Sequence, residues 1–426
     1  RANLISTDGW SIIDGGTAPL APFDMTVRTT AANETFTIPC QNVGTFNATV
    51  DWGDGSSSTV ATYNDANLVH TYASAGDHSI SISGTFPNIY FAYTGDRAKV
   101  IAVTNLGQVG WQTFKSAFMG CDYMTTFNFG THTDTSSITD MSGMFRACER
   151  LSTVDLSTLN TSSVTNFSRM FDQVMRKSST IGGSIDVSNF DTSSGINFYG
   201  MFQNMNYLTS LDVSSFDTSN ATNMSSMFYG LVRLTSLDVS NFDTSNVLYM
   251  DAMFNSNFAM TSLDLSSFDT SNVRYMDSMF QSCLALSSLD ISSFRTPNII
   301  GTISMFSGTG ALAVIDVSNF DTSNVTNFGG MFRLNPGNNR SDIIGIENLN
   351  FEGVNQTNAL SDFITNMALP TSRYDQLLIN IDAQTITQTT PANFGTSQYT
   401  AGGAAEAARA NIISTKGWTI TDGGTA

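Results

Sequence analysis

A single 26-residue period runs through the middle of this chain and limits what it can fold into. Residues 208–233 read "LTSLDVSSFDTSNATNMSSMFYGLVR", and the next 26 read "LTSLDVSNFDTSNVLYMDAMFNSNFA". The Met-Phe pair of the motif recurs in steps of 26, apart from one step of 31, with its methionines at Met144, Met170, Met201, Met227, Met253, Met279, Met305 and Met331. A fixed short period predicts a solenoid, in which each coil contacts only its two neighbours.

Each part of the motif predicts a local structure. Leu211 and Val213 alternate with polar residues, which is typical of a short strand with one face inward. The letters "FDTSN" are turn-forming, with side chains that bond nearby amides. "MSSMF" predicts a helical turn that directs Met227 and Phe228 into the core. Counting degenerate coils around Phe118 and Phe351, we expect about nine to ten coils that bury one continuous core.

The segment before the repeats predicts a different fold. In residues 22–95, "FTIPC" and "HSISIS" alternate as strands do, and "DWGDGSS" is typical of a tight turn between two strands. We expect a β-sandwich with Trp52 in its core. Asp51 and Asp54 suggest a metal site, but turn formation is the better interpretation of carboxylates in a Gly-rich turn.

The segment after the repeats, 359–426, predicts a cap over the last coil, because open solenoid ends need one. "TSRYDQLLINIDAQ" has helical spacing, with Ser372 as its expected N-cap, and "GGAAEAARANIIS" predicts a second helix. "WTITDGG" predicts a final strand. We therefore expect a mainly β chain with short helices.

The two ends of the chain carry nearly the same sequence. Residues 1–18 and 409–426 agree at 14 of 18 positions without gaps. We interpret residues 1–21 as the tail of a preceding unit plus a linker, so that the chain is one 408-residue period of a tandem array. The alternative is a single protein with a duplicated N-terminal segment, which docks against a neighbouring copy.

The repeats resemble a known family. The combination of "LTSLDVSSF", "FDTSN" and "MSSMF" at a 26-residue period is similar to the BspA-like class of bacterial surface leucine-rich repeats. The resemblance covers about residues 100–355, within a solenoid that we expect over 96–358. "VDWGDGSSSTV" in residues 22–95 resembles a PKD-type β-sandwich. The resemblance implies a leucine-rich-repeat solenoid in an extracellular or cell-surface protein used for adhesion and recognition, and it supplies no catalytic residues.

Charge and motif content exclude several function classes. The chain has 36 acidic and 18 basic residues, a formal net charge of -18, so nucleic acid is not an expected partner. No apolar run reaches the ~18 residues that span a bilayer, so we expect no membrane insertion. With three histidines, no phosphate-binding glycine loop, no HExxH and no CxxC, we predict no catalytic or cofactor-binding residues and no enzyme activity.

Aspartates recur in register with the coils and need an explanation. One column contains Asp155, Asp186, Asp212, Asp238, Asp264, Asp290 and Asp316, and a second contains Asp191, Asp217, Asp243, Asp269 and Asp321. Neighbouring charges at about 5 Å repel by roughly 0.8 kcal/mol in water. Either hydrogen bonds to turn amides and hydroxyls offset this repulsion, or calcium bridges the coils, with Asp212, Asp238, Asp264 and Asp290 as weak candidate ligands. We favour hydrogen bonding because the Gly-rich Asp loops of calcium solenoids are missing.

Two cysteines occupy the same position in consecutive coils. Cys121 in "FMGC" and Cys148 in "FRAC" each follow a coil phenylalanine by three residues. The spacing places them within reach of a disulfide. The alternative, which we favour, is a pair of small buried thiols.

Together these features predict a non-catalytic, extracellular structural or adhesive protein, one period of a giant tandem-repeat surface protein or fibre. The expected partners are copies of the chain in a head-to-tail array, and surface glycans or proteins. Two alternatives stay open: a virus-type receptor-binding fibre, and a ligand-recognising adhesin that acts as a single unit. Trimerisation would favour the first of these.

Overall fold

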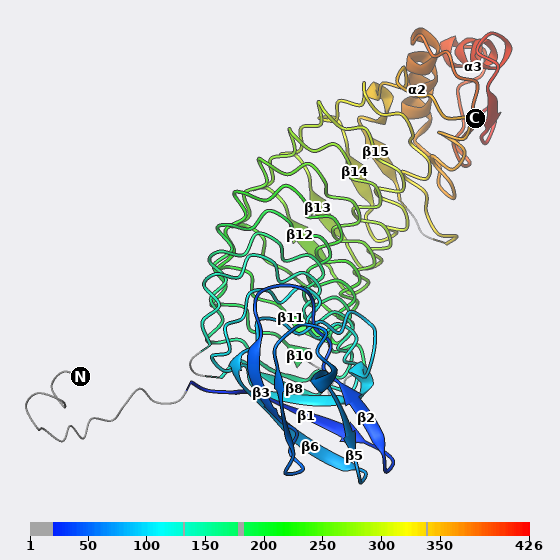
Figure 1. The fold of residues 1–426 in the computed structure, drawn as a ribbon. Helices are drawn as coiled ribbons and strands as arrows, with labels where there is room; N and C mark the ends of the chain where they lie inside the picture. The colour runs from blue at the N-terminus through cyan, green and yellow to red at the C-terminus, as the bar shows by residue number, and fades with distance from the viewer. Residues whose placement is uncertain (1–19, 131–132, 178–182, 338–339) are drawn as a thin grey trace, which may run out of the picture.

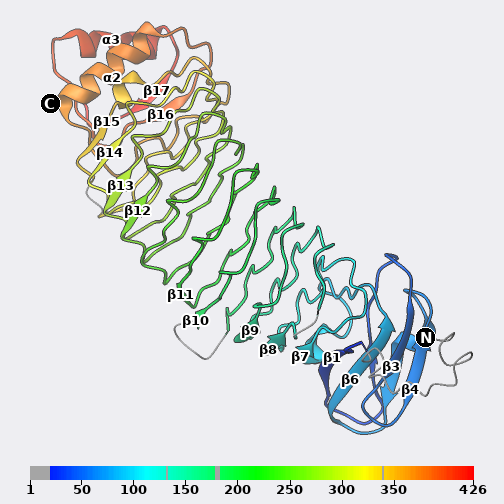
Figure 2. The ribbon, with the colours of Figure 1, turned by 90° about the vertical axis from the view of Figure 1, so that its left-hand side faces the viewer.

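The computed structural model describes residues 20–130, 133–177, 183–337 and 340–426, so the duplicated segment 1–18 lies outside the described residues. The fold is mainly β with few helices and forms a β-solenoid of about 12 turns. The solenoid is long and curved, with antiparallel strands at one end and two helices at the other (Figures 1 and 2).

The solenoid has more turns than the nine to ten that the repeat count predicted. At one end, Phe91 N donates to Ala117 O at 3.2 Å, and at the other Phe394 N donates to Thr421 O at 2.8 Å. These bonds continue the coil-to-coil pattern into segments that have lost the Met-Phe motif. The count was wrong because backbone hydrogen bonds, which do not need that motif, define a turn.

In the described residues from position 20 onward, six strands precede the coils. They are β1 (Phe23–Thr29), β2 (Glu34–Thr37), β3 (Asn47–Asp51), β4 (Ser57–Val60), β5 (Val69–Tyr72) and β6 (Gly76–Thr85). β4, β3, β6 and β1 pair antiparallel in that order, while β2 and β5 form a separate pair. As predicted, "DWGDGSS" closes the β3–β4 hairpin, where Gly53 N donates to Asp51 at 2.9 Å and Ser56 N to Asp54 at 3.0 Å. Trp52 is buried, also as predicted.

The sheet of the first strands continues into the solenoid. β1 pairs antiparallel with β7 (Val100–Asn105), which pairs parallel with β8 (Thr126–Asn128) and through it with β9 (Thr153–Asp155). The result is one seven-stranded sheet. β1 therefore covers the edge that the first solenoid strand would otherwise expose to other chains.

Along the solenoid, strands of two or three residues pair parallel, one coil apart. They are β10 (Gly183–Ser184), β11 (Leu208–Ser210), β12 (Ser262–Asp264), β13 (Ser288–Asp290), β14 (Val314–Asp316) and β15 (Asp342–Ile344). Between β12 and β13, Leu263 is opposite Leu289, and Asp264 is opposite Asp290. The described residues also include three short 3₁₀ segments. They are η1 (Ala66–Leu68) between β4 and β5, η2 (Arg97–Lys99) before β7, and η3 (Ile346–Asn348) after β15.

The "MSSMF" segment is not the predicted helical turn. Ser226 has φ 56°, in the left-handed region that interrupts a right-handed helix. Alternate amides point to the next coil instead: Ser226 N donates to Asp251 O at 2.7 Å and Phe228 N to Met253 O at 3.1 Å. The tertiary hydrogen bonds override the local helical pattern and hold Arg169, Ser226, Ala252, Ser278 and Ser304, at the same position of their coils, in the left-handed conformation.

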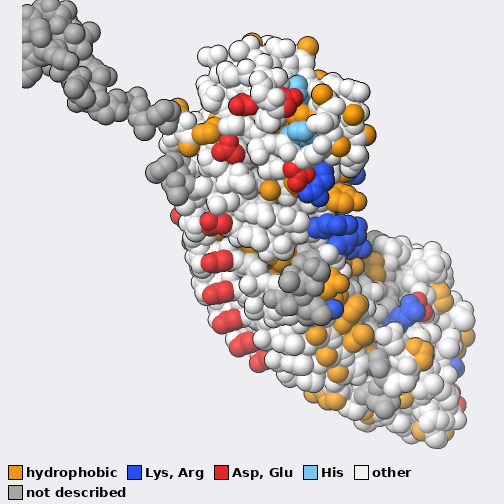
Figure 3. All heavy atoms as spheres, turned by 90° about the horizontal axis from the view of Figure 1, so that it is seen from below, with side chains coloured by type: hydrophobic (Ala, Val, Ile, Leu, Met, Phe, Trp, Pro, Cys, Tyr) orange, Lys and Arg blue, Asp and Glu red, His pale blue; other side chains and the backbone are white. Residues whose placement is uncertain are grey.

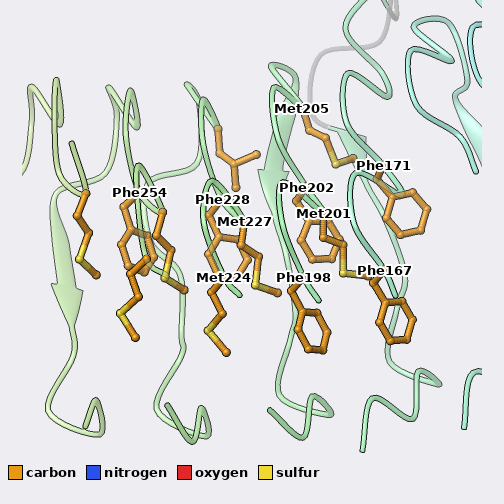
Figure 4. Close-up of a cluster of buried hydrophobic side chains, with 14 of the residues drawn as sticks. Phe167, Phe171, Phe198, Met201, Phe202, Met205, Met224, Met227, Phe228 and Phe254 are labelled. Carbon is orange, nitrogen blue, oxygen red and sulfur yellow. The ribbon is translucent and has the colours of Figure 1, made fainter. Parts of the chain in front are cut away.

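The core is built from columns of methionine and phenylalanine (Figure 4). Phe228 and Phe254 are fully buried, and their ring centroids lie 5.8 Å apart with nearly parallel planes. Phe202 stacks on the other face of Phe228 at 6.0 Å. Because each ring contacts the equivalent ring in the next coil, the repeat produces a continuous core, as predicted.

The last turns each include a helix. α2 (Thr371–Ala383) and β16 (Pro391–Asn393) are followed by α3 (Ala404–Ser414) and β17 (Thr419–Thr421), with β16 and β17 parallel. Ser372 is not the N-cap, because Pro370 takes that position and no side chain caps the helix. Within the described ranges, no helix is both long enough and apolar enough to cross a membrane.

Candidate functional site

The first aspartate column, which runs from Asp155 to Asp316, is held by hydrogen bonds inside each turn. Every carboxylate of this column accepts a bond from the amide of the serine two residues later, at 2.9–3.0 Å. Bonds from this serine lower the pKa of the carboxyl groups of Asp155, Asp186, Asp212, Asp238, Asp264 and Asp290. The contacts agree with the hydrogen-bonding interpretation, since the bond favours the charged form.

The "FDTSN" turns contain the second aspartate column and also join neighbouring coils. Asp217 accepts a bond from Ser219 N within its own turn at 2.9 Å. The buried Thr218 Oγ1 donates to Asp243 O in the next coil at 2.8 Å, and Thr244 repeats the contact with Asp269 O at 2.8 Å. Asn246 Nδ2 donates back to Ser219 O at 2.8 Å. Each turn therefore uses its Asp within the coil, its Thr toward the next coil and its Asn toward the previous one.

The candidate calcium ligands lie in one column without converging. Asp264 and Asp290 line a shallow depression of about 600 Å³ over β12 and β13. In the part of the chain that the structure describes, no three His, Cys, Asp or Glu side chains group closely enough to hold a metal ion. Calcium at Asp212, Asp238, Asp264 or Asp290 stays a prediction.

Cys121 and Cys148 are buried free thiols, so the alternative with a disulfide is not what the structure contains. Cys148 Sγ contacts Phe118 O at 3.2 Å. Burial raises the pKa of both thiols well above the ordinary value. Both groups therefore stay neutral and act as small core side chains.

Sequence reasoning missed a row of cations and tyrosines at the corner that follows each coil phenylalanine. The guanidinium carbon of Arg150 lies 4.5 Å from the ring centroid of Tyr123, and that of Arg233 lies 4.7 Å from Tyr207. Lys and Arg side chains gather on one side of the molecule in Figure 3, while acidic side chains follow another edge. The signal was present in the sequence: the fifth residue after the phenylalanine is Tyr or Arg in the early coils and Ala in later ones.

A second feature that sequence reasoning missed is a pair of partly buried carboxylates, Asp251 and Asp277, on adjacent coils. Asp251 accepts bonds from Ser225 Oγ at 3.2 Å and Asp277 N at 3.3 Å, and Asp277 accepts from Ile303 N at 2.6 Å. Burial raises the pKa of both carboxyl groups, that of Asp277 to about 6, with the Asp251 charge contributing. Gly301 makes room for this pair, since a Cβ there would lie 2.4 Å from Asp277 Oδ2.

A comparison with known protein families matches the coils. The matched family is described as "Mycoplasma protein of unknown function, DUF285", and the matches cover 112–230, 173–258, 196–314, 232–346 and 285–376. Together they span 112–376, or 265 of 426 residues. The chain belongs to the DUF285 family. No curated protein matches the chain of this DUF285 member.

The DUF285 matches overlap one another and are offset along the repeats. They begin after β7 and end inside α2, so they include neither the antiparallel strands β1–β6 nor β16 and β17. The matched range is thus the range of the coils, which contain the first aspartate column, the Asp251–Asp277 pair and the stacked pairs Arg150–Tyr123 and Arg233–Tyr207.

In this DUF285 protein, Asp277→Asn should increase the free energy of unfolding at pH 7.5 by on the order of 1 kcal/mol. The folded pKa of about 6 lies above the unfolded value, so the wild type loses stability as pH rises through 6. Asparagine removes the ionisation and keeps an oxygen for Ile303 N. Urea denaturation at pH 4.5 and 7.5 measures the difference, which should shrink at the lower pH.

The matched control for this prediction is Asp264→Asn. Asp264 is exposed, and hydrogen bonds from Ser266 lower the pKa of its carboxyl group, so removing its charge should not stabilise the protein at pH 7.5. Equal stability of Asp277→Asn and wild type at pH 7.5 would contradict the prediction.

Proposed function

We propose that this protein is a non-catalytic structural and adhesive protein of the cell exterior, in which the solenoid is a stiff spacer. One observation carries the proposal: the Asp, Thr and Asn side chains of the "FDTSN" turns bond within and between coils. Polar groups that are engaged in this way hold successive coils in register. The rows of "FDTSN" side chains along the solenoid are therefore a mechanical element and not a row of free ligand-binding groups.

Recognition belongs to a different surface in this proposal. The BspA-like repeat pattern supports adhesion at a cell surface, and the "VDWGDGSSSTV" hairpin supports a PKD-like module before the coils. The pairing of β1 with β7 supports a stiff connection between that module and the solenoid. The irregular corner, whose side chains change from coil to coil, is the better candidate for contact with a partner.

We further propose that the unit recurs every 408 residues in its parent protein. In the C-terminal copy of the repeated segment, Trp418 and Ile412 are buried, and Arg409 pairs with Asp422 at 2.8 Å. Tyr374 Oη donates to the same carboxylate at 2.7 Å. The N-terminal copy retains the Arg, Trp and Asp of this set in its sequence, which supports a second use of the same docking residues.

The mass of the native polypeptide, reduced and fully denatured, tests the array. The 426-residue chain has a mass of 45.9 kDa, and a recombinant copy serves as the marker. We expect a native mass that is several times larger and rises in steps of the 408-residue unit. A native mass equal to that of the marker would overturn the covalent array and favour docking between separate copies.

A further inference from the structure

Half of the cations of this acidic chain lie in a minority of its length. Nine of the 18 Lys and Arg residues fall between positions 97 and 233: Arg97, Lys99, Lys115, Arg146, Arg150, Arg169, Arg176, Lys177 and Arg233. The same stretch contains ten Asp and Glu residues, so it is close to neutral in a chain whose net charge is -18. A site for an anion in this stretch therefore depends on which cations have no carboxylate partner.

Six side chains from the coils between positions 118 and 233 form what we name the arginine–tyrosine corner: Tyr123, Arg150, Arg176, Lys177, Tyr207 and Arg233. They follow the coil phenylalanines by five or six residues, so they lie in a line along the solenoid axis. Adjacent coils are about 4.8 Å apart, the spacing of paired strands. A linear molecule that runs along the corner would therefore meet these side chains in succession.

Two arginines of the corner are oriented by tyrosine rings instead of carboxylates. The guanidiniums of Arg150 and Arg233 stack at 4.5 Å and 4.7 Å on Tyr123 and Tyr207. Across the described parts of the chain, neither has a carboxylate within ion-pair distance. Stacking leaves the edge of a guanidinium open, so its N–H groups can bind a carboxylate or sulfate in a bidentate manner.

The surface beside these arginines is hollowed. A depression of about 450 Å³ is lined by Arg176, Lys177 and Arg233 together with Glu149, Asn206 and Tyr207. Its three cations outnumber its single carboxylate, Glu149, which pairs with both Arg176 and Lys177. Among the described residues, Arg233 is the cation of this depression that has no carboxylate partner. A second depression of about 230 Å³ shares Glu149 and Lys177 with the first, so the two adjoin.

We propose that the arginine–tyrosine corner binds a linear acidic polysaccharide that carries carboxylate or sulfate groups. The inference rests on the proposed adhesive function and names its ligand class. Free guanidinium edges match the anionic groups, while the amide of Asn206 and the phenol of Tyr207 suit sugar hydroxyls. The ring of Tyr207 and the side chain of Val232 supply apolar surface for the faces of sugar rings.

The test compares two double variants with the same change in charge. Arg150→Gln/Arg233→Gln removes the stacked cations, and Arg274→Gln/Arg333→Gln removes two exposed cations outside the corner. Binding of the 426-residue chain to heparin, hyaluronate and neutral dextran is measured by calorimetry at two salt concentrations. Circular dichroism checks that both variants are folded.

We expect wild type to bind at least one acidic polymer, more weakly at higher salt, and not to bind dextran. The corner variant should bind at least about tenfold more weakly, while the control variant should bind like wild type. Failure of wild type to bind either acidic polymer, or equal weakening in both variants, would overturn the proposal.

Two further results would assign the corner to another partner. Single-stranded DNA that binds as tightly as the acidic sugars would show a surface that reads charge alone and would overturn the sugar assignment. Wild type that self-associates in sedimentation, with a corner variant that does not, would show that the corner binds a second copy of the chain through its aspartate column. That result would also overturn the sugar assignment. The native mass is measured separately, so failure here leaves the proposed structural role standing.

Discussion

Replacing Phe254 by alanine should lower the free energy of unfolding by about 3–5 kcal/mol. The ring is fully buried and stacks on Phe228 at 5.8 Å and on Phe280 at 6.0 Å. Alanine would leave a cavity that interrupts a column in which each ring depends on its neighbours. The backbone of each coil is bonded to the coils on both sides, so it cannot collapse to fill this space.

Urea denaturation measures the loss, and native-state hydrogen exchange locates it. Because coils interact mainly with their neighbours, protection should fall most in the coils next to Phe254. Phe258→Ala is the control: this ring, four residues later in the same coil, is 43% exposed and should cost far less. A loss below about 1 kcal/mol for Phe254→Ala would contradict the view that the stacked column stabilises the solenoid.

Gly107→Ala should destabilise the junction between the antiparallel strands and the first coil by more than about 2 kcal/mol. Gly107 has φ +64°, and a Cβ would lie 2.2 Å from Pro22 O, just before β1. The left-handed conformation alone costs alanine about 1–2 kcal/mol, and the backbone clash adds to it. To relieve the clash, residues 21 and 22 would have to move away from Gly107. That movement would break the hydrogen bond from Asn105 Nδ2 to Pro22 O and the one from Gln108 N to Ala21 O.

Gly110→Ala separates the two contributions, since Gly110 has φ +80° but its nearest neighbour to an added Cβ is Thr85 Cγ2 at 3.8 Å. Gly110→Ala should lower the free energy of unfolding only by the conformational contribution of about 1–2 kcal/mol. Thermal unfolding of both variants, with hydrogen exchange across β1 and β7, gives the comparison. Equal stability of the two variants would show that the close approach at Pro22 does not hold the junction.

Some of the candidate sites can be predicted from the repeated sequence, and others cannot because they occur in one or two coils only. The bond between Asp212 and the amide of Ser214 is predictable because its partners are two residues apart and the pattern recurs in every coil. Asp251 and Asp277 depart from the consensus sequence of the motif in two coils only, so the repeat pattern does not predict their contact. The stacking of Arg150 on Tyr123 joins residues 27 apart, and either residue alone is an ordinary surface side chain.

The sequence by itself determined the solenoid, its inward Leu, Val, Met and Phe columns and the use of Asp in each turn. These features follow from a local pattern that repeats, and stacking identical coils leaves few other ways to bury it. Only the tertiary structure decided that β1 would pair with β7, that "MSSMF" would bond to the next coil instead of forming a helix, and that the coils would number about 12. Each of these outcomes depends on hydrogen bonds between segments that are distant in the chain. Local propensity does not encode such pairing, which the packed neighbours impose.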